Sequence, residues 1–272
     1  MHLSRHITSG RAELATEVVG SGTAIVFLHA NVCNRRMWKD QLDGLGTTYK
    51  AIAYDRRGFG ESRSKPEDFS ALADLMAVLD ATADGEPAIL VGCSLGGRIA
   101  LEAALKYPSR VSALVLIAPN VTGAPEPTYS PELAKLMMQA KDAEASNDPD
   151  RLRTMKARLW LDGPLASEGR VAGQARDRFL YSFAIPSSSS GTDVDSTPLS
   201  DRLAEISVPT FVLWGDLDFP HVQARCRHVA TTVPNAEGYE MPGVAHLPNL
   251  ERPAEISALI AAFAARRAAS NR

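Results

Sequence analysis

The sequence predicts an α/β fold with a mostly parallel central sheet flanked by helices, and two observations support that prediction. Short apolar runs recur along the 272 residues, and each is nearly continuous instead of alternating, as in strands buried on both faces. Helix-like segments, with apolar residues three and four positions apart, stand between these runs. Strand and helix in alternation favour a parallel sheet with helices on both of its faces.

The elements are expected in the following order. Residues 2–20 predict two strands around Ser9-Gly10, which form a hairpin at the edge of the sheet. The segment 252–269 has Pro253 in its first turn and predicts a long amphipathic helix at the C-terminal end. Between them, strands are expected at residues 24–30, 50–55, 88–93, 111–119 and 210–216, and helices at residues 74–83 and 95–107.

The alternation of strand and helix breaks once, between residues 121 and 203. Helical patterns occur there at residues 131–146, 149–163 and 168–184. They are followed by a stretch rich in Ser, Gly and Asp, residues 187–197, which predicts a mobile linker. We therefore expect residues 1–120 and 204–272 to form the α/β core, and residues 121–203 to form a helical cap over the sheet.

Composition and charge limit the possible partners. The chain has 45% apolar and 22% charged residues, which is typical of a globular protein in water. A formal net charge of −3 gives no reason to expect nucleic acid or an anionic membrane as a partner. No apolar run approaches the roughly 20 residues of a membrane helix, and no secretory signal is expected. The three cysteines fit neither a disulfide framework nor a metal site, so a cytoplasmic protein without metal is expected.

A short motif at the predicted strand-to-helix turn indicates a nucleophile. Residues 92–96, Gly-Cys-Ser-Leu-Gly, match the pattern G-x-S-x-G. A sharp turn would present the Ser94 hydroxyl at its tip, and the two glycines would let the strand and the helix approach closely. The N-terminus of the following helix offers free N–H groups to a developing negative charge. The alternative is that Ser94 only caps the helix, which does not account for small residues on both sides.

A serine hydroxyl is a weak nucleophile without a base, and the base and its acid are expected later in the chain. Asp216 and Asp218 come at the end of the last predicted strand, and His246 stands in a loop before the last helix. Sites of α/β sheets form at the carboxyl ends of parallel strands. His246 is therefore the candidate base and Asp218 the candidate acid that orients it. Asp216 is the rival acid, interpreted as a turn or capping residue.

Further candidates surround the predicted nucleophile. The backbone N–H groups of Leu95 and Asn31 are expected to stabilise an oxyanion, since they follow the serine and the third strand, respectively. Trp38, Trp160 and Phe219 are candidates for substrate contact and suggest a small, partly apolar substrate. For Trp160, the alternative is packing within the cap, because aromatic residues at helical spacing are more often core residues.

Taken together, the segments "HANVCNRRMW", "YDRRGFGES", "VGCSLGG", "LVLIAP", "VLWGDLD" and "PGVAHLPNLERP" resemble the successive blocks of the α/β-hydrolase superfamily. More narrowly, the chain is similar to bacterial serine esterases and lactonases, the neighbourhood of 3-oxoadipate enol-lactonase. The resemblance covers about residues 22–120 and 205–268. It implies the α/β-hydrolase fold and no cofactor, and its triad acid is the fourth residue of the G-x-x-D block. The implied site residues are Ser94, Asp218 and His246 as catalytic triad, with Asn31 and Leu95 as oxyanion donors.

Two segments near the site receive a structural role only. His29 is expected to hold its loop by hydrogen bonding, and it precedes Ala30 where many relatives have glycine. In "YDRRGFGES", residues 54–62, Asp55 and the arginines are expected to brace the loop beside the oxyanion site. Cys93 occupies the variable position of the motif and is expected to be a packing residue.

The leading functional hypothesis is a serine hydrolase that cleaves a small carboxylic ester or lactone through an acyl-enzyme. A small-molecule substrate is the one partner expected. A carbon–carbon bond hydrolase or a perhydrolase would use the same triad on the same scaffold. A ligand receptor without catalysis is the third possibility, and the presence of all three triad residues disfavours it.

Overall fold

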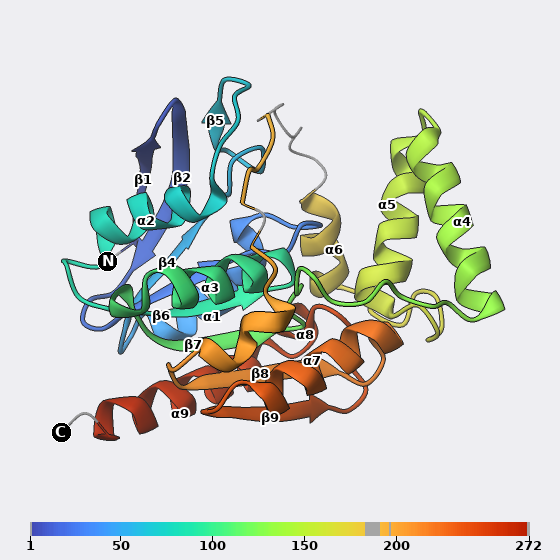
Figure 1. The fold of residues 1–272 in the computed structure, drawn as a ribbon. Coiled ribbons are helices and arrows are strands. Elements are labelled where there is room, and N and C mark those ends of the chain that lie inside the picture. Colours follow the sequence, from blue (N-terminus) through green and yellow to red (C-terminus); the bar gives the residue numbers. More distant parts are fainter. Residues whose placement is uncertain (1, 183–190, 196, 271–272) are drawn as a thin grey trace.

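The computed structural model describes residues 2–182, 191–195 and 197–270 and shows one twisted sheet with helices on both faces (Figure 1). The sheet has nine strands in the order β1-β2-β4-β3-β6-β7-β8-β9, with β5 paired to β2. The strands β3, β4, β6, β7, β8 and β9 run parallel, and β1, β2 and β5 pair antiparallel. The predicted α/β fold with a mostly parallel sheet is confirmed.

The strands span β1 His2–Ser9, β2 Ala12–Val19, β3 Ala24–Leu28, β4 Lys50–Tyr54, β5 Arg63–Ser64, β6 Ala88–Cys93, β7 Val111–Ile117, β8 Thr210–Gly215 and β9 Ala236–Met241. The helices span α1 Lys39–Leu45, α2 Ala71–Thr82, α3 Leu95–Lys106, α4 Pro131–Ala145, α5 Pro149–Ala157, α6 Gln174–Tyr181, α7 Pro220–Thr232, α8 Pro248–Glu251 and α9 Pro253–Ser270. Shorter helical turns are η1 Arg35–Trp38, η2 Pro108–Arg110, η3 Arg158–Asp162 (a π-helix) and η4 Ser200–Glu205.

The core consists of two apolar layers, one on each face of the sheet. Helices α2, α3 and α7 supply buried side chains to one layer, and α1, α8 and α9 supply them to the other. Successive residues of β3 alternate between the layers: Val26 and Leu28 belong to the first, Ile25 and Phe27 to the second. Every residue of β3 is buried, which explains why its sequence is apolar throughout instead of alternating.

One edge of the sheet agrees with the expectation, and the other does not. The edge hairpin forms as predicted, with Gly10 in its turn at a φ of 56°. Strand β9 was not expected, because its sequence AEGYEM has no apolar run. The structure explains this, since four of its six residues are exposed at the sheet edge. Within the described residues, no helix is both long and apolar enough to cross a membrane.

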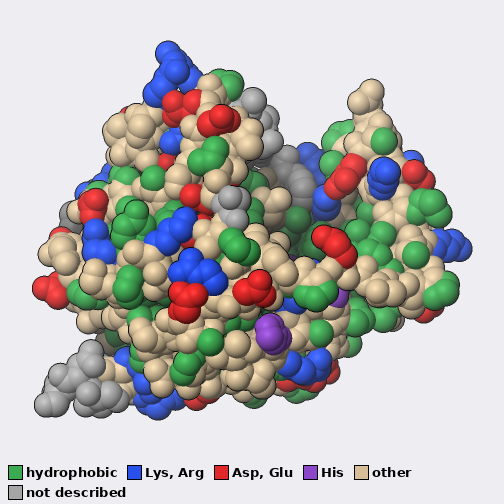
Figure 2. All heavy atoms as spheres, viewed as in Figure 1, with side chains coloured by type: hydrophobic (Ala, Val, Ile, Leu, Met, Phe, Trp, Pro, Cys, Tyr) green, Lys and Arg blue, Asp and Glu red, His purple; other side chains and the backbone are tan. Residues whose placement is uncertain are grey.

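Between β7 and β8 the chain forms α4, α5, η3 and α6, at the carboxyl end of the sheet (Figure 1). A hollow separates the α4–α5 pair from the body of the molecule on the face shown in Figure 2. The helix predicted at 168–184 is shorter than expected, because α6 begins only at Gln174. In the predicted linker, residues 187–190 and 196 lie outside the described residues. Residues 191–195 are not a free linker, since Phe69 makes backbone hydrogen bonds to Thr192 and Val194.

Candidate active site

Ser94 lies at a strained turn between β6 and α3. Its φ of 53° and ψ of −116° are rare for a residue with a side chain. The neighbouring glycines make the turn possible, because a Cβ on Gly92 would lie 2.5 Å from the carbonyl oxygen of Gly96. A Cβ on Gly96 would lie 2.2 Å from the carbonyl oxygen of Leu28. The turn therefore has the geometry expected for G-x-S-x-G, and its serine makes no side-chain cap hydrogen bond.

Asp218 and His246 form a buried pair at the carboxyl end of the sheet. The Nδ1 atom of His246 lies 2.7 Å from Oδ2 of Asp218, and the two residues are only 2% and 3% exposed, respectively. The other carboxylate oxygen, Oδ1, accepts the backbone N–H of Phe219 at 2.7 Å. Asp216 takes no part in this pair, since its Oδ1 accepts the N–H of Gly243 at 2.6 Å. The structure thus places Asp216 in a turn and Asp218 beside the histidine.

The residue before the candidate nucleophile contacts the loop that carries the candidate base. Cys93, the residue before Ser94, lies with its Sγ 3.8 Å from the carbonyl oxygen of His246. No hydrogen bond joins the hydroxyl of Ser94 to the ring of His246 in the described part of the chain. Burial raises the pKa of the Cys93 thiol well above its ordinary value, so this residue packs in the protonated form.

The two candidate oxyanion donors line one cavity. Asn31 and Leu95 both border a cavity of about 180 Å³. Their N–H groups enter no hydrogen bond among the described residues. Leu95 is the first residue of α3, where a helical N–H has no partner within the helix. The two groups are therefore available to the same ligand.

The loops around this cavity are held by buried polar contacts. The Nε2 atom of His29 accepts the N–H of Arg56 at 3.0 Å, and its Nδ1 lies 2.8 Å from the carbonyl oxygen of Ala30. Burial lowers the pKa of His29 well below its ordinary value, which favours this neutral form. Asp55 accepts the N–H groups of Arg35 and Glu61. These contacts agree with the structural roles expected for His29 and Asp55.

The three aromatic candidates are placed differently. The ring of Trp160, in η3, lies 4.7 Å from that of His246 and 5.0 Å from that of Phe219, measured between centres. Phe219 is 1% exposed and forms the wall behind Trp160. Trp38 is 0% exposed and packs against Phe27, with 5.2 Å between ring centres, in the apolar layer to which α1 also contributes. For both Trp38 and Phe219, contact with a substrate stays a prediction.

Tyr54 and Arg56 are among the residues of the cavity wall that sequence reasoning missed. Both stand in the segment "YDRRGFGES", to which only bracing was assigned. Arg57 does brace the loop, since it donates two hydrogen bonds to Asp74. Arg56 does not, because no ion pair with an acidic side chain involves it in the described residues. Adjacent arginines look alike in a sequence, and only their surroundings distinguish them.

Comparisons with known proteins identify the family of this chain. Residues 25–259 match the sequence model of the alpha/beta hydrolase family. The AB hydrolase superfamily protein YisY of Bacillus subtilis is 30% identical over 227 residues, which cover 78% of this chain and 80% of YisY. The 2-hydroxy-6-oxononadienedioate/2-hydroxy-6-oxononatrienedioate hydrolase of Comamonas testosteroni is 29% identical over 245 residues, 84% of this chain and 82% of that enzyme.

A solved structure shows the same fold. The thermophilic esterase of Thermogutta terrifontis superposes with a TM-score of 0.79 at 24% identity, over 98% of this chain and 99% of the esterase. The family match covers most of the chain, including the turn at Ser94 and the loop of His246. The chain therefore belongs to the α/β-hydrolase family.

Proposed function

We propose that this α/β-hydrolase is a serine hydrolase that cleaves a small carboxylic ester or lactone. The observation that supports the proposal best is the 2.7 Å contact between Asp218 and His246, next to a serine at a strained turn. A carboxylate at Nδ1 keeps the proton on that nitrogen, so that Nε2 is free to act as base. The Nε2 atom has no hydrogen bond to any described residue, so its lone pair is free to accept the proton of Ser94.

The proposed reaction has two stages. The Oγ atom of Ser94 attacks the carbonyl carbon while its proton passes to Nε2 of His246. The oxyanion accepts hydrogen bonds from the N–H groups of Leu95 and Asn31. The carbon–oxygen bond to the leaving group then breaks, and His246 returns the proton to the leaving alcohol. Water attacks the acyl-enzyme, again with His246 as base, and the acid leaves as Ser94 recovers its proton. From a lactone, acid and alcohol remain in one molecule.

The hydrogen bond between Ser94 and His246 is expected to form as substrate binds. Catalytic hydrogen bonds of this kind often tighten only in the complex with substrate. Trp160 lies against the imidazole of His246 and is half-buried, so it gives the candidate base an apolar neighbour.

The proposal is tested by comparing Ser94→Ala with Ser112→Ala on p-nitrophenyl butyrate and γ-butyrolactone. Ser112 lies in β7, and its buried hydroxyl has no hydrogen-bond partner among the described residues. We expect Ser94→Ala to lower kcat by at least about 10³-fold, and Ser112→Ala to retain activity. Hydrolysis by Ser94→Ala at a rate close to that of the wild type would contradict the proposal.

A carbon–carbon bond hydrolase is the second candidate. It is supported by the similarity to the Comamonas testosteroni hydrolase, since cleavage of that enzyme's named substrate breaks a carbon–carbon bond. The same triad would serve both reactions. A panel of esters, lactones and a vinylogous diketone separates the candidates: a kcat/KM highest for the diketone would favour the second one.

A further inference from the structure

A buried arginine faces the cavity beside the candidate oxyanion donors. Arg56 is 7% exposed and borders the same 180 Å³ space as Asn31 and Leu95. Its Nε and Nη2 atoms are buried and have no hydrogen-bond partner among the described residues. Burial lowers the pKa of Arg56 from its ordinary value to about 10, so it is still charged at neutral pH. A buried cation without a hydrogen-bond partner destabilises the folded protein. Such a residue is therefore a candidate for a functional role.

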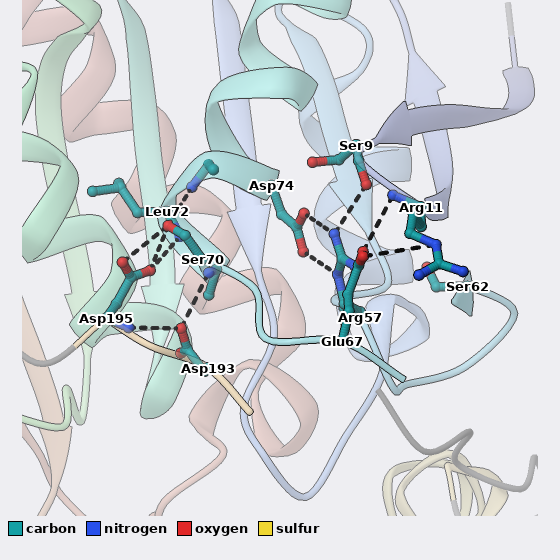
Figure 3. Close-up of polar contacts among 12 residues, drawn as sticks. Ser9, Arg11, Arg57, Ser62, Glu67, Ser70, Leu72, Asp74, Asp193 and Asp195 are labelled. Carbon is teal, nitrogen blue, oxygen red and sulfur yellow. Dashed lines mark hydrogen bonds and ion pairs between the residues drawn. The ribbon is translucent and has the colours of Figure 1, made fainter. Parts of the chain in front are cut away.

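The acidic side chains that border this cavity are engaged with other residues (Figure 3). Asp74 accepts hydrogen bonds of 2.9 and 3.1 Å from the guanidinium of Arg57. Asp193 forms an ion pair with Arg98. It also accepts the backbone N–H groups of Ala71 and Asp195. Because these carboxylates are held by other arginines, none of them gives Arg56 a hydrogen-bond acceptor.

Within the described part of the chain, the remaining contacts of Arg56 supply no acceptor for its Nε and Nη2 atoms. Its guanidinium lies over the ring of Phe59, 4.5 Å from the ring centre, a contact that offsets only part of the cost of burying the charge. Asp193 acts on the charge of Arg56 through space and raises its pKa, but its ion pair is with Arg98. Among the described residues, the buried N–H groups of Arg56 therefore remain without an acceptor.

A second polar group points to the same ligand. Tyr54 ends β4 and borders the cavity, and its hydroxyl is buried without a hydrogen-bond partner among the described residues. Burial raises the pKa of this phenol, so it is a proton donor at neutral pH. Arg56 and Tyr54 therefore both line one cavity, and each has a buried polar group without a partner among the described residues.

We propose that this cavity binds a carboxylate carried by the substrate, which accepts hydrogen bonds from Arg56 and Tyr54. A planar carboxylate matches the paired N–H groups of a guanidinium and has further lone pairs for a phenol. The cavity is more than ten times the roughly 10–15 Å³ that one water molecule needs, so a carboxylate on a short chain fits. This inference rests on the proposed serine-hydrolase function and narrows its substrate class.

The carboxylate belongs to the acyl part of the substrate. In the proposed reaction His246 gives a proton to the leaving group, so the leaving group lies beside His246 and Trp160. Neither of these residues borders the cavity, whereas the candidate donors to the carbonyl oxygen, Asn31 and Leu95, do. The substrate class is therefore a half-ester of a short dicarboxylic acid, or a lactone formed from a short hydroxy-dicarboxylic acid that keeps one free carboxylate.

The first experiment compares two esters that differ in charge at one end. Monomethyl glutarate carries a free carboxylate, and the methyl ester of glutaramic acid has a neutral amide in its place. We expect the wild type to prefer the acidic ester by kcat/KM. In Arg56→Met this preference falls by about 10- to 100-fold, mainly through KM, since a charge-assisted contact is lost. Arg110→Met removes an arginine that pairs with Asp80 at the amino end of β7, and it keeps the wild-type preference.

One further variant and a melting temperature keep the test decisive. Tyr54→Phe removes only the unpartnered hydroxyl and lowers the preference by several-fold, so it replaces Arg56→Met if that protein does not fold. Arg56→Met is expected to melt at or above the temperature of the wild type, because a buried unpaired charge is replaced by an apolar chain. A preference unchanged in both Arg56→Met and Tyr54→Phe would overturn the carboxylate site.

Binding to an inactive protein separates this inference from the proposed function. Calorimetric titration of Ser94→Ala with glutarate should show binding that weakens about 10-fold or more when Arg56→Met is added. If glutarate binds in this way but the wild type cleaves no ester, the proposed reaction is wrong and the carboxylate site stands. If esters are cleaved but glutarate binds no better than chloride, the carboxylate site is wrong and the reaction stands.

Discussion

The indole of Trp160 packs against the imidazole of His246, with 4.7 Å between the ring centres. Trp160 comes from the helical segment between β7 and β8, whereas His246 comes from the loop before α8. The contact therefore links the proposed cap to the proposed base. It also places a large apolar surface where a leaving group would lie.

Trp160→Ala should lower kcat/KM for small apolar esters by about 10-fold or more, because an aromatic wall of the site is lost. Trp160→Phe keeps a ring and should lose less. The control is Leu165→Ala, which changes a side chain that is 56% exposed in the same segment. Equal kcat/KM values for Trp160→Ala and Leu165→Ala would show that Trp160 does not contact the substrate.

The two aspartates after β8 should differ sharply on substitution. Asp218→Asn keeps the size and shape of the side chain but no longer fixes the proton on Nδ1 of His246. The value of kcat should therefore fall by about 10³- to 10⁴-fold. Asp216→Asn keeps an oxygen for the N–H of Gly243 and should stay within about threefold of the wild type. The measurement is kcat for both variants on one ester, and the reverse order would make Asp216 the acid.

Two glycine-to-alanine changes should shift stability in opposite directions. Gly96→Ala puts a Cβ 2.2 Å from the carbonyl oxygen of Leu28, so the protein should lose more than about 3 kcal/mol of unfolding free energy or not fold. Gly44→Ala lies in α1, where its Cβ would meet only the side chain of Ser257 at 3.6 Å. It should gain about 0.5–1 kcal/mol from helix propensity. Urea unfolding measures the free energy of unfolding of both variants. A Gly96→Ala protein as stable as the wild type would contradict the close approach of residue 96 to the carbonyl oxygen of Leu28.

His221 should contribute to acid sensitivity. Burial first, and then Arg225, lower the pKa of His221 from 6.5 to about 4. Between these two values the unfolded chain binds more protons than the folded one, so stability falls as the pH drops through this window. The free energy of unfolding of the wild type, minus that of His221→Gln, should therefore be larger near about pH 7 than near about pH 4.5. An equal difference at both pH values would show that the pKa of His221 is the same in the folded and the unfolded protein.

Much of the fold follows from local patterns. The continuous apolar runs become buried strands because helices cover both faces, and Gly92 and Gly96 mark the tight turn because no larger residue fits there. Strand β9 has no such pattern, since its pairing to β8 uses the backbone while its side chains face solvent. An edge strand of this kind is set by its neighbour more than by its own residues.

The candidate site was predictable where a motif fixes its members. The order of Ser94, Asp218 and His246 in the chain suggested the pair that the structure brings to 2.7 Å. The loop-like sequence around Trp38 predicts contact with the substrate, which stays a prediction, and the structure buries its side chain in the core. The role proposed for Arg56 depends on where Asp74 points, which no local pattern records.

Mass spectrometry of the protein mixed with an activated ester and quenched within the first turnover tests the central claim most directly. We predict an acyl adduct on Ser94 alone, formed in the wild type, slowed in His246→Ala and absent in Ser94→Ala. An adduct on another residue, or full ester turnover in Ser94→Ala, would contradict the account.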